Sequence, residues 1–463
     1  MKAQRGWRPM VKAGPEPLYS RVVAALERDV ASGVLPVGAR LPPQRELAEQ
    51  LSIGVGTVTK AYSEAERRGL LRARVGQGSF VAAQTRTRVS ALEGPIDLAN
   101  NLPPTRGVEA TFLELLPKLV HDDAVLDLLD YPPSDGPERY RNAAAAWLVR
   151  TSGFERLDAR ELVLCNGATQ GVWLVLQQRT EPGDTVLCEA ATFFGFKSMA
   201  EHLRLKLVGV AMDDEGIEPE ALSRAAVETG ARLVLLIPTL HNPTTRACSR
   251  ERREVIVEVA RAHELTIVED DVYSCFARGA SAAPPLAALA PERTWYVNAA
   301  SKTIAPGLRV GWILPPRSGR DELVRAIRTL ISGPAMFGHL VFAKLVESGD
   351  AYRLLDGVIA EAHARTELAR AVLSERMSLP AAAQSLHAWL PMPAEQAERV
   401  ARIALQGGVR VTPPSSPIVG PEAPTGVRIC LGAPRERETL ERALHVVRDA
   451  VAALAGEMEE PVI

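Results

Sequence analysis

Hydrophobic residues near the N-terminus recur at helical spacing. Because an α-helix turns once in 3.6 residues, an apolar side chain at every fourth position predicts an amphipathic helix, here ending at Gly33. A turn rich in Pro and Gly and two further helical stretches follow. The first helix carries Leu18, Val22, Leu26 and Val30; the second carries Leu47, Ala48 and Leu51; the third carries Val55, Val58, Ala61, Tyr62 and Ala65.

The last two predicted helices are joined by a three-residue turn, Ser52-Ile53-Gly54. Two short helices joined in this way form a helix-turn-helix, whose second helix enters the major groove of DNA by its N-terminal end. Residues 70–75 and 79–81 then alternate around a Gly-Gln-Gly turn, which predicts a β-hairpin. The segment is interpreted as a winged helix-turn-helix; a helical oligomerisation module is the alternative.

From about residue 96 the pattern changes to short apolar runs separated by helical stretches. Such runs are typical of a mostly parallel sheet buried on both faces, so the expected fold class is α/β. Ligands of such sheets bind at the carboxyl ends of the strands. The apolar runs are 161–164, 185–188, 233–237, 266–269 and 295–297.

Length and composition leave room for two or three domains. The chain has 463 residues, of which 46% are hydrophobic. Its five cysteines show no Cys-x-x-Cys spacing, which argues against a metal site or a disulfide framework and favours the reducing cytosol. No apolar run approaches the roughly 20 residues that cross a bilayer. We therefore expect a cytoplasmic protein without a bound metal and without membrane contact.

The net charge of −2 hides an uneven distribution. Residues 1–88 hold 3 Lys and 12 Arg against 7 acidic residues, a charge of +8, and the remaining residues carry −10. A basic segment on an acidic chain favours a polyanionic partner, although an ordinary basic surface explains the charge equally well.

The N-terminal segment resembles the winged helix-turn-helix of GntR-type regulators over roughly residues 17–82. The resemblance implies operator DNA as a partner, a DNA-binding domain over residues 15–82 and a linker over residues 83–95. Many family members place Ser-Arg where this chain has Gly54-Val55, so other side chains are expected to contact phosphates and bases. Matching residues are 17–19, 41–48, 57–62 and 76–81, and the candidate contacts are Arg40, Arg45, Thr57, Thr59, Lys60, Arg72 and Arg74.

Small and polar residues follow three of the apolar runs. Residues 166–171 would expose backbone N–H groups at the start of a helix, where a phosphate can bind, although such turns are often small for steric reasons alone. Phe193 can stack on a flat cofactor or pack in the core. Asn242, which precedes a proline, can donate to a phenolate oxygen or form a plain turn.

An acid, a phenol and a lysine near later strand ends are more informative. Asp270 follows a buried run, and a desolvated carboxylate there needs a cation such as a protonated pyridine nitrogen. Tyr273 can reach the neighbouring ring oxygen, and Lys302 supplies an amine. Arg309 can hold a phosphate by two hydrogen bonds. These side chains are the ones needed to hold pyridoxal phosphate as a Schiff base.

Residues 96–463 resemble the class I aminotransferases of fold type I. The resemblance implies a mostly parallel sheet with a smaller α/β C-terminal subdomain and pyridoxal phosphate as cofactor. Three residues before the lysine the family usually has Ser or Thr on the phosphate, whereas this chain has Ala299, so Ser301 or water would replace that hydrogen bond. The implied roles are Lys302 for the Schiff base, Asp270 for the ring nitrogen, Tyr273 and Asn242 for the ring oxygen, Arg309, Gly167, Ala168 and Thr169 for the phosphate, Phe193 for stacking, Tyr131 for the phosphate of a dimer partner, and Arg428 for a substrate carboxylate.

Both modules in one chain resemble the MocR-type regulators. The resemblance implies a cytoplasmic homodimer that binds operator DNA and senses pyridoxal phosphate, an amine or an amino acid, and it favours a regulator over an enzyme. A working aminotransferase with an accessory DNA-binding domain stays open, because Lys302, Asp270 and Arg428 are all present. A pyridoxal phosphate carrier or non-catalytic scaffold is the third alternative.

Overall fold

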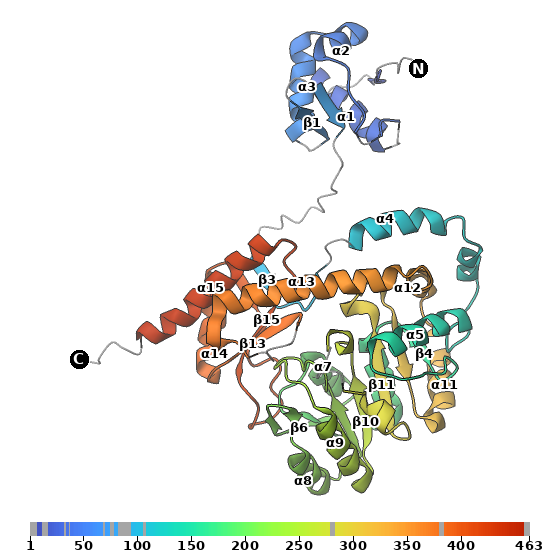
Figure 1. Ribbon diagram of the computed structural model, residues 1–463, viewed down its shortest axis with the longest axis vertical. Helices are drawn as coiled ribbons and strands as arrows, with labels where there is room; N and C mark the ends of the chain where they lie inside the picture. The colour runs from blue at the N-terminus through green and yellow to red at the C-terminus, as the bar shows by residue number, and fades with distance from the viewer. Residues whose placement is uncertain are drawn as a thin grey trace. The chain divides into compact units, whose positions relative to one another are not determined.

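The chain forms two compact units, residues 1–94 and residues 95–463 (Figure 1). The computed structural model describes residues 7–11, 17–31, 34–36, 38–67, 70–74, 78–81, 94–104, 108–277, 283–378 and 384–457. The side chain of Arg74, one of the candidate DNA contacts, lies outside the described ones, as does most of the expected linker.

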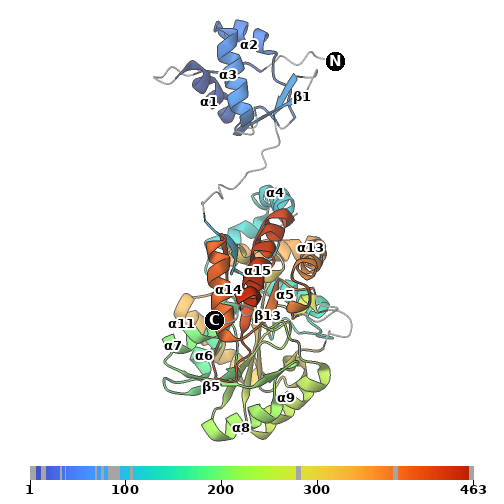
Figure 2. The same cartoon turned by 90° about the vertical axis from the view of Figure 1, so that its left-hand side faces the viewer.

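The first unit is a three-helix domain with a two-stranded hairpin (Figure 2). Ser52, in the turn before the third helix, adopts a left-handed backbone conformation (φ 54°), and its amide donates to the carbonyls of Ala48 and Glu49. This arrangement confirms the expected winged helix-turn-helix. The elements are α1 Leu18–Ala31, α2 Gln44–Leu51, α3 Val55–Arg67, β1 Leu71–Arg74 and β2 Gly78–Val81.

The helical spacing of the apolar residues builds the core of this unit. Leu47 and Val58 are fully buried where α2 and α3 pack together, and Tyr62 is anchored by a 2.8 Å hydrogen bond from its hydroxyl to the carbonyl oxygen of Pro42. The opposite face of α3 remains exposed at Thr59 and Lys60. Packing therefore fixes which face of α3 is available to a ligand.

The second unit is built on a seven-stranded sheet with the order β4-β12-β11-β10-β9-β5-β6. Only β12 runs against its neighbours in this sheet, so the sheet is mostly parallel, as expected from the apolar runs. The strands are β4 Val163–Cys165, β5 Thr185–Glu189, β6 Lys206–Val210, β9 Leu233–Leu236, β10 Thr266–Asp270, β11 Thr294–Ala299 and β12 Gly311–Leu314.

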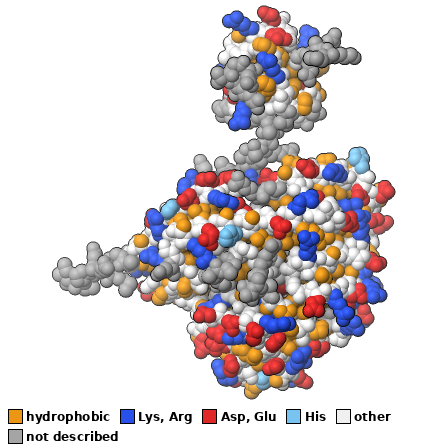
Figure 3. All heavy atoms as spheres, in the orientation of Figure 1, with side chains coloured by type: hydrophobic (Ala, Val, Ile, Leu, Met, Phe, Trp, Pro, Cys, Tyr) orange, Lys and Arg blue, Asp and Glu red, His pale blue; other side chains and the backbone are white. Residues whose placement is uncertain are grey.

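Helices cover this sheet because its strands are apolar on both faces. Figure 3 shows acidic and basic side chains interspersed over the visible face of the second unit. The helices are α4 Val108–Leu119, α5 Glu138–Thr151, α6 Ala168–Arg179, α7 Phe194–His202, α8 Pro219–Thr229, α9 Arg250–Ala262, α10 Leu286–Leu289, α11 Arg320–Ile331 and α12 Met336–Glu347; short elements are η1 Asp123–Leu129, η4 Ala300–Lys302, η5 Pro306–Leu308, β7 Met212–Asp213 and β8 Gly216–Ile217.

A smaller subdomain with its own core follows the long helix α13 (orange in Figure 1). The subdomain is α/β, as expected, but it is not made from the C-terminal part alone, because β3, at the start of the unit, pairs in parallel with β14. Its elements are β3 Ile96–Leu98, α13 Asp350–Leu373, β13 His387–Pro391, α14 Ala394–Gln406, β14 Val409–Val411, β15 Gly426–Cys430 and α15 Arg437–Glu457. No helix in the described ranges is long and apolar enough to cross a membrane.

Candidate functional site

Asp270 is the last residue of β10 and is buried at the carboxyl edge of the sheet. Within the described chain its Oδ1 atom is buried without a hydrogen-bond partner. Burial raises the pKa of its carboxyl group to about 7, and the nearby Lys302 ammonium opposes that rise. A cation placed against Oδ1 would stabilise the ionised form, so the site fits the protonated ring nitrogen of pyridoxal phosphate.

Lys302 follows β11, the neighbour of β10, and its amine is also buried. Its Nζ donates a 2.5 Å hydrogen bond to the main-chain oxygen of Asn101. Burial lowers the pKa of the Lys302 ammonium to about 8. A larger share of the amine is therefore neutral near pH 7 than for an exposed lysine, as nucleophilic attack requires.

Tyr273 lies beside this pair. Its hydroxyl accepts a 2.9 Å hydrogen bond from Asn101 Nδ2, and its ring lies 5.6 Å from the ring of His387. Burial raises the pKa of the Tyr273 hydroxyl, so the group stays protonated and can donate to an oxygen of a bound ligand.

Arg428 and Asn242 meet directly. The Arg428 guanidinium, on β15, donates from Nη1 to Asn242 Oδ1 over 2.7 Å, from Nη2 to the main-chain oxygen of Ala99 over 2.7 Å, and from Nε to Thr412 Oγ1 over 3.0 Å. The guanidinium is buried, and its hydrogen-bond acceptors among the described residues are neutral. A carboxylate would be a stronger acceptor than the carbonyl oxygens it now holds.

The expected phosphate loop lies against Arg309. Gly167 has φ 90° and precedes α6, so Ala168 and Thr169 begin the helix and their amide N–H groups lack helical partners. A Cβ atom on Gly167 would lie 2.8 Å from Arg309 Nη2, and this nitrogen donates a 3.0 Å hydrogen bond to the Asn166 carbonyl. The close approach, free amides and guanidinium suit a phosphate.

The remaining predicted residues are placed as follows. Phe193 packs in an aromatic group, 4.8 Å from the Phe194 ring and 5.4 Å from the Phe196 ring, and is partly exposed. Ser301 is partly exposed in the turn before Lys302, whereas Ala299 is buried and has no donor. Tyr131 has 87% of its surface exposed, so its own chain does not bury it.

Candidate DNA contacts lie on α2, α3 and the hairpin of the first unit, and Arg40 lies before α2, where it bridges to Phe80 of β2. Arg40, Arg45, Lys60 and Arg72 are exposed, whereas Thr57 is half-buried. The Thr59 hydroxyl donates to Gln44 Oε1 over 2.7 Å, and Lys60 Nζ lies 4.2 Å above the Tyr19 ring. These internal contacts leave Arg40, Arg45 and Arg72 as the cations with the greatest freedom to reach a phosphate.

Sequence reasoning missed three residues of the site. Asn101 contacts Lys302 and Tyr273, and its Nδ2 also lies 3.2 Å from His387 Nδ1. Glu189, at the end of β5, accepts a 2.7 Å hydrogen bond from the Ile237 amide, and burial raises the pKa of its carboxyl to about 7. The position of Glu189 directly after an apolar run could have marked it as a site residue. No sequence pattern marked Asn101 or His387.

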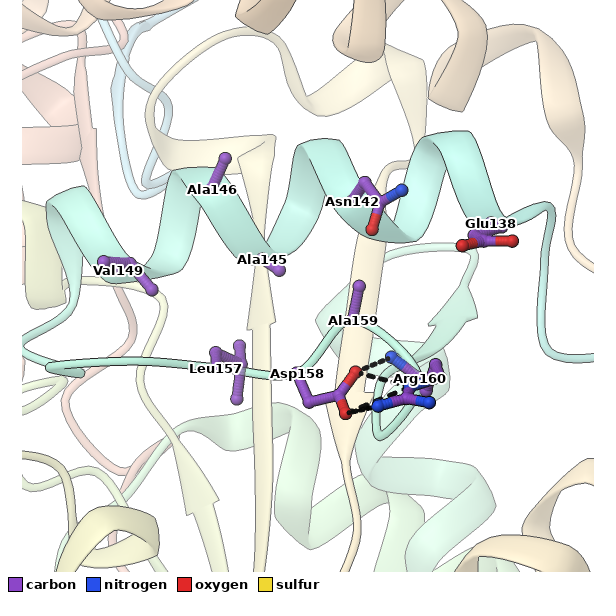
Figure 4. Close-up of a pocket in the computed structure, with 9 residues that line it drawn as sticks. All are labelled: Glu138, Asn142, Ala145, Ala146, Val149, Leu157, Asp158, Ala159 and Arg160. Carbon is purple, nitrogen blue, oxygen red and sulfur yellow. Dashed lines mark hydrogen bonds and ion pairs between the residues drawn. The ribbon is translucent and has the colours of Figure 1, made fainter.

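A surface hollow lies elsewhere, between α5 and residues 157–160 (Figure 4). It has a volume of about 560 Å³ and shares no residue with the cluster around Lys302. Asp158 and Arg160 in its wall are hydrogen-bonded to each other. Asp158 and Arg160 thus already satisfy each other, and the lining holds no buried carboxylate or amine comparable to those of the Lys302 cluster.

A family model described as "Aminotransferase class I and II" matches residues 93–447. The chain belongs to this family. A model described as "Bacterial regulatory proteins, gntR family" matches residues 18–81. The two matches confirm the two-module organisation expected of MocR-type proteins, and together with the fold they identify pyridoxal phosphate as the cofactor of the second unit.

Similar proteins span most of the chain. An uncharacterized HTH-type transcriptional regulator of Bacillus subtilis, YdeF, is 28% identical over 96% of both chains. The vitamin B6 salvage pathway transcriptional repressor PtsJ of Salmonella typhimurium is 28% identical over 81% of this chain and 85% of its own. The HTH-type pyridoxine biosynthesis transcriptional regulator PdxR of Corynebacterium glutamicum is 25% identical over 69% of this chain and 70% of its own.

Solved structures share the fold of the second unit. An archaeal alanine:glyoxylate aminotransferase matches with a TM-score of 0.71 at 19% identity, covering 86% of this chain and 95% of its own. LysN, an α-aminoadipate aminotransferase from Thermus thermophilus, matches with a TM-score of 0.69 at 21% identity, covering 86% and 99%. These likenesses confirm the fold type I architecture.

The raised pKa of Asp270 predicts a pH effect on stability. Between the usual carboxyl pKa of about 4 and the folded value of about 7, the cofactor-free folded chain binds a proton that the unfolded chain has lost. The Asp270 contribution therefore makes the free energy of unfolding fall as pH rises through this window. Because an amide does not titrate, Asp270→Asn should gain stability relative to the parent between pH 5 and pH 8, as measured by urea unfolding. Parallel pH profiles for the two proteins would contradict the assignment.

Proposed function

We propose that this protein is a cytoplasmic, homodimeric transcriptional regulator that binds operator DNA through its first unit and is controlled by ligand binding in its second. The single observation that carries the proposal is one chain that joins a gntR-type winged helix to a pocket with the donors and acceptors for pyridoxal phosphate. Two similar proteins, PtsJ and PdxR, bear names that place them in the transcriptional control of vitamin B6 metabolism.

The residue roles within the proposal follow from the contacts described above. Lys302 would attach the cofactor, Asp270 would pair with its ring nitrogen, and Tyr273 and Asn242 would donate to its ring oxygen. Arg309 and the start of α6 would hold the phosphate. The cofactor supplies an electrophilic carbon to which an amine can bind. Since Arg428 is a buried cation beside this site, the ligand we expect is an amine that also bears a carboxylate.

A dimer is supported by a row of exposed apolar side chains leading to Tyr131. Large exposed apolar surfaces are typical of protein interfaces, and a regulator of this kind reads two half-sites. In this dimer Tyr131 would reach the phosphate site of the partner subunit. The row comprises Leu113 (67% exposed), Leu116 (38%), Val120 (74%), Leu126 (63%) and Leu129 (81%) on α4, η1 and their connection.

A working aminotransferase with an accessory DNA-binding unit is the second candidate. It is favoured by the lowered pKa of Lys302, which suits proton transfer and exchange of amines at neutral pH, and by the presence of Arg428 in the same pocket. The regulator and the enzyme make different predictions about turnover and DNA affinity.

Lys302→Ala should abolish covalent attachment of the cofactor. The parent protein incubated with pyridoxal phosphate should be yellow, and borohydride should trap the adduct on the peptide that contains Lys302. Lys206→Ala is the control, because Lys206 is exposed on the edge strand β6. An adduct that survives in Lys302→Ala, detected by peptide mass spectrometry, would show that another amine binds the cofactor.

Arg45→Ala and Thr57→Ala should affect DNA binding differently. Arg45→Ala removes one phosphate contact, so it should weaken binding to all DNA sequences and reduce the slope of log affinity against log salt concentration by about 1. Thr57→Ala should instead alter preference at particular base pairs and leave the salt slope unchanged. Fluorescence anisotropy with the operator duplex and with unrelated duplexes, repeated over a range of salt concentrations, measures both the sequence preference and the salt slope. Equal operator affinity of the second unit alone would refute the assignment of DNA binding to the first.

Operator affinity measured with and without pyridoxal phosphate tests the function itself. A coupling of about 1 to 3 kcal/mol, typical of allosteric proteins, would change the affinity by roughly 5- to 150-fold. Footprinting of the region upstream of the gene identifies the duplex. Unchanged affinity in cofactor-free and cofactor-bound protein, together with multiple-turnover transamination, would make the protein an enzyme instead.

A further inference from the structure

The first residues of the second unit lead directly to its candidate ligand site. Ile96, one residue after Pro95, is fixed to the smaller subdomain by a 2.7 Å hydrogen bond from its amide to the Gly408 carbonyl and by the pairing of β3 with β14. The chain then leaves β3 at Leu98, and Ala99 to Asn101 reach the Lys302 cluster. Two residues, Ala99 and Asn100, therefore separate the pairing strand from the residue bound to Lys302.

The shortest hydrogen bonds to the Ala99 and Asn101 carbonyls come from groups that a ligand needs; the Ala99 carbonyl also accepts longer bonds from Cys430 Sγ (3.3 Å) and Thr412 Oγ1 (3.4 Å). Lys302 donates to the Asn101 carbonyl over 2.5 Å, and Arg428 donates to the Ala99 carbonyl over 2.7 Å. Both bonds come from cations, which makes them stronger than bonds between neutral groups. Tyr273 accepts from the Asn101 side chain.

A ligand competes for these donors. When the Lys302 nitrogen bonds to the aldehyde carbon of pyridoxal phosphate, the aldehyde oxygen leaves as water and the nitrogen keeps at most one of the three protons of the ammonium group. Its bond to the Asn101 carbonyl is then lost or weakened. A ligand carboxylate on Arg428 would likewise take a donor from the Ala99 carbonyl.

The turn that precedes these contacts has its own brace. Asp97 Oδ1 accepts from the Ala99 amide over 2.7 Å and from the Asn100 amide over 3.2 Å, and Asp97 Oδ2 accepts from Asn100 Nδ2 over 2.6 Å. Asp97 lies on β3 and touches neither Lys302 nor Arg428 in the described contacts. The brace can therefore be removed without changing the ligand-binding side chains.

We propose that Ala99–Asn101 is a ligand-displaced latch: Lys302 and Arg428 hold it when they are free, and release it when they engage the cofactor and a carboxylate ligand. Because β3 directly follows Pro95, release loosens the point at which the chain from the DNA-binding unit enters the second unit. The regulatory consequence rests on the proposed function, whereas the release itself does not.

Hydrogen–deuterium exchange of the full chain tests the release. Adding pyridoxal phosphate should raise exchange in the peptide that covers residues 96–104 by about tenfold or more, since hydrogen bonds to charged groups typically contribute about 1.5–3 kcal/mol. Covalent attachment is followed in the same sample by absorbance. Attachment with unchanged or reduced exchange in this peptide would overturn the proposal, whatever happens at DNA.

Asp97→Ala tests the link to the operator. Without its brace the latch should already be loose, so the ratio of operator affinities with and without pyridoxal phosphate should fall toward 1 while cofactor attachment persists. Asp158→Ala is the matched control, because Asp158 caps the amide of Arg160 two residues later, over 2.9 Å, in the surface hollow of Figure 4. A ratio in Asp97→Ala equal to that of the parent and the control would refute the link. A parent ratio of 1 would refute the proposed function and leave the exchange result to decide the latch.

Discussion

Burial of Asp270 at the carboxyl edge of the sheet is the constraint on which the site depends. A carboxylate in that position has lost its water, and the protein leaves one of its oxygens without a hydrogen-bond partner within the described residues. In the cofactor-free chain, a proton on Asp270 near neutral pH avoids the free-energy cost of burying a charged carboxylate, as the pKa of about 7 indicates. A cationic ring nitrogen beside the ionised carboxylate would offset the same cost. Cofactor binding and the stability of the sheet edge are therefore coupled through one side chain.

The topology explains why Lys302 can serve the same ligand. The strands β10 and β11 are parallel neighbours, so the residues that follow them emerge at the same edge. The antiparallel strand β12 then returns beside β4, where Gly311 is so close to Gly167 that a Cβ on Gly311 would lie 2.6 Å from the Gly167 Cα. This contact places Arg309, two residues earlier, against the loop before α6. The groups proposed to bind the ring nitrogen and the phosphate, Asp270 and Arg309, are thus positioned by consecutive connections of one sheet.

Local pattern was sufficient to predict the strands and to single out residues that follow them. Asp270 and Lys302 each come at or just after the end of a strand, and their roles toward a cofactor stay predictions. Asn101 could not be found in this way, because it follows β3, whose pairing with β14 joins segments more than 300 residues apart. His387 is the first residue of β13 and does not follow one of the apolar runs. The same long-range pairing explains why the part that β3 plays in the smaller subdomain was not foreseen: nothing in Ile96–Leu98 indicates a partner at Val409–Val411.

The contacts of Arg428 bear on both candidate functions of this protein, regulator and enzyme. In either case the guanidinium must be held in position to bind a carboxylate. Here the guanidinium is buried and donates to Asn242, Ala99 and Thr412 at once. A carboxylate on this guanidinium would compete with these acceptors, and Ala99 is the one that belongs to the segment leading back to the first unit. In the proposed regulator, such competition between a ligand and the protein's own backbone would couple occupancy of the site to the rest of the chain.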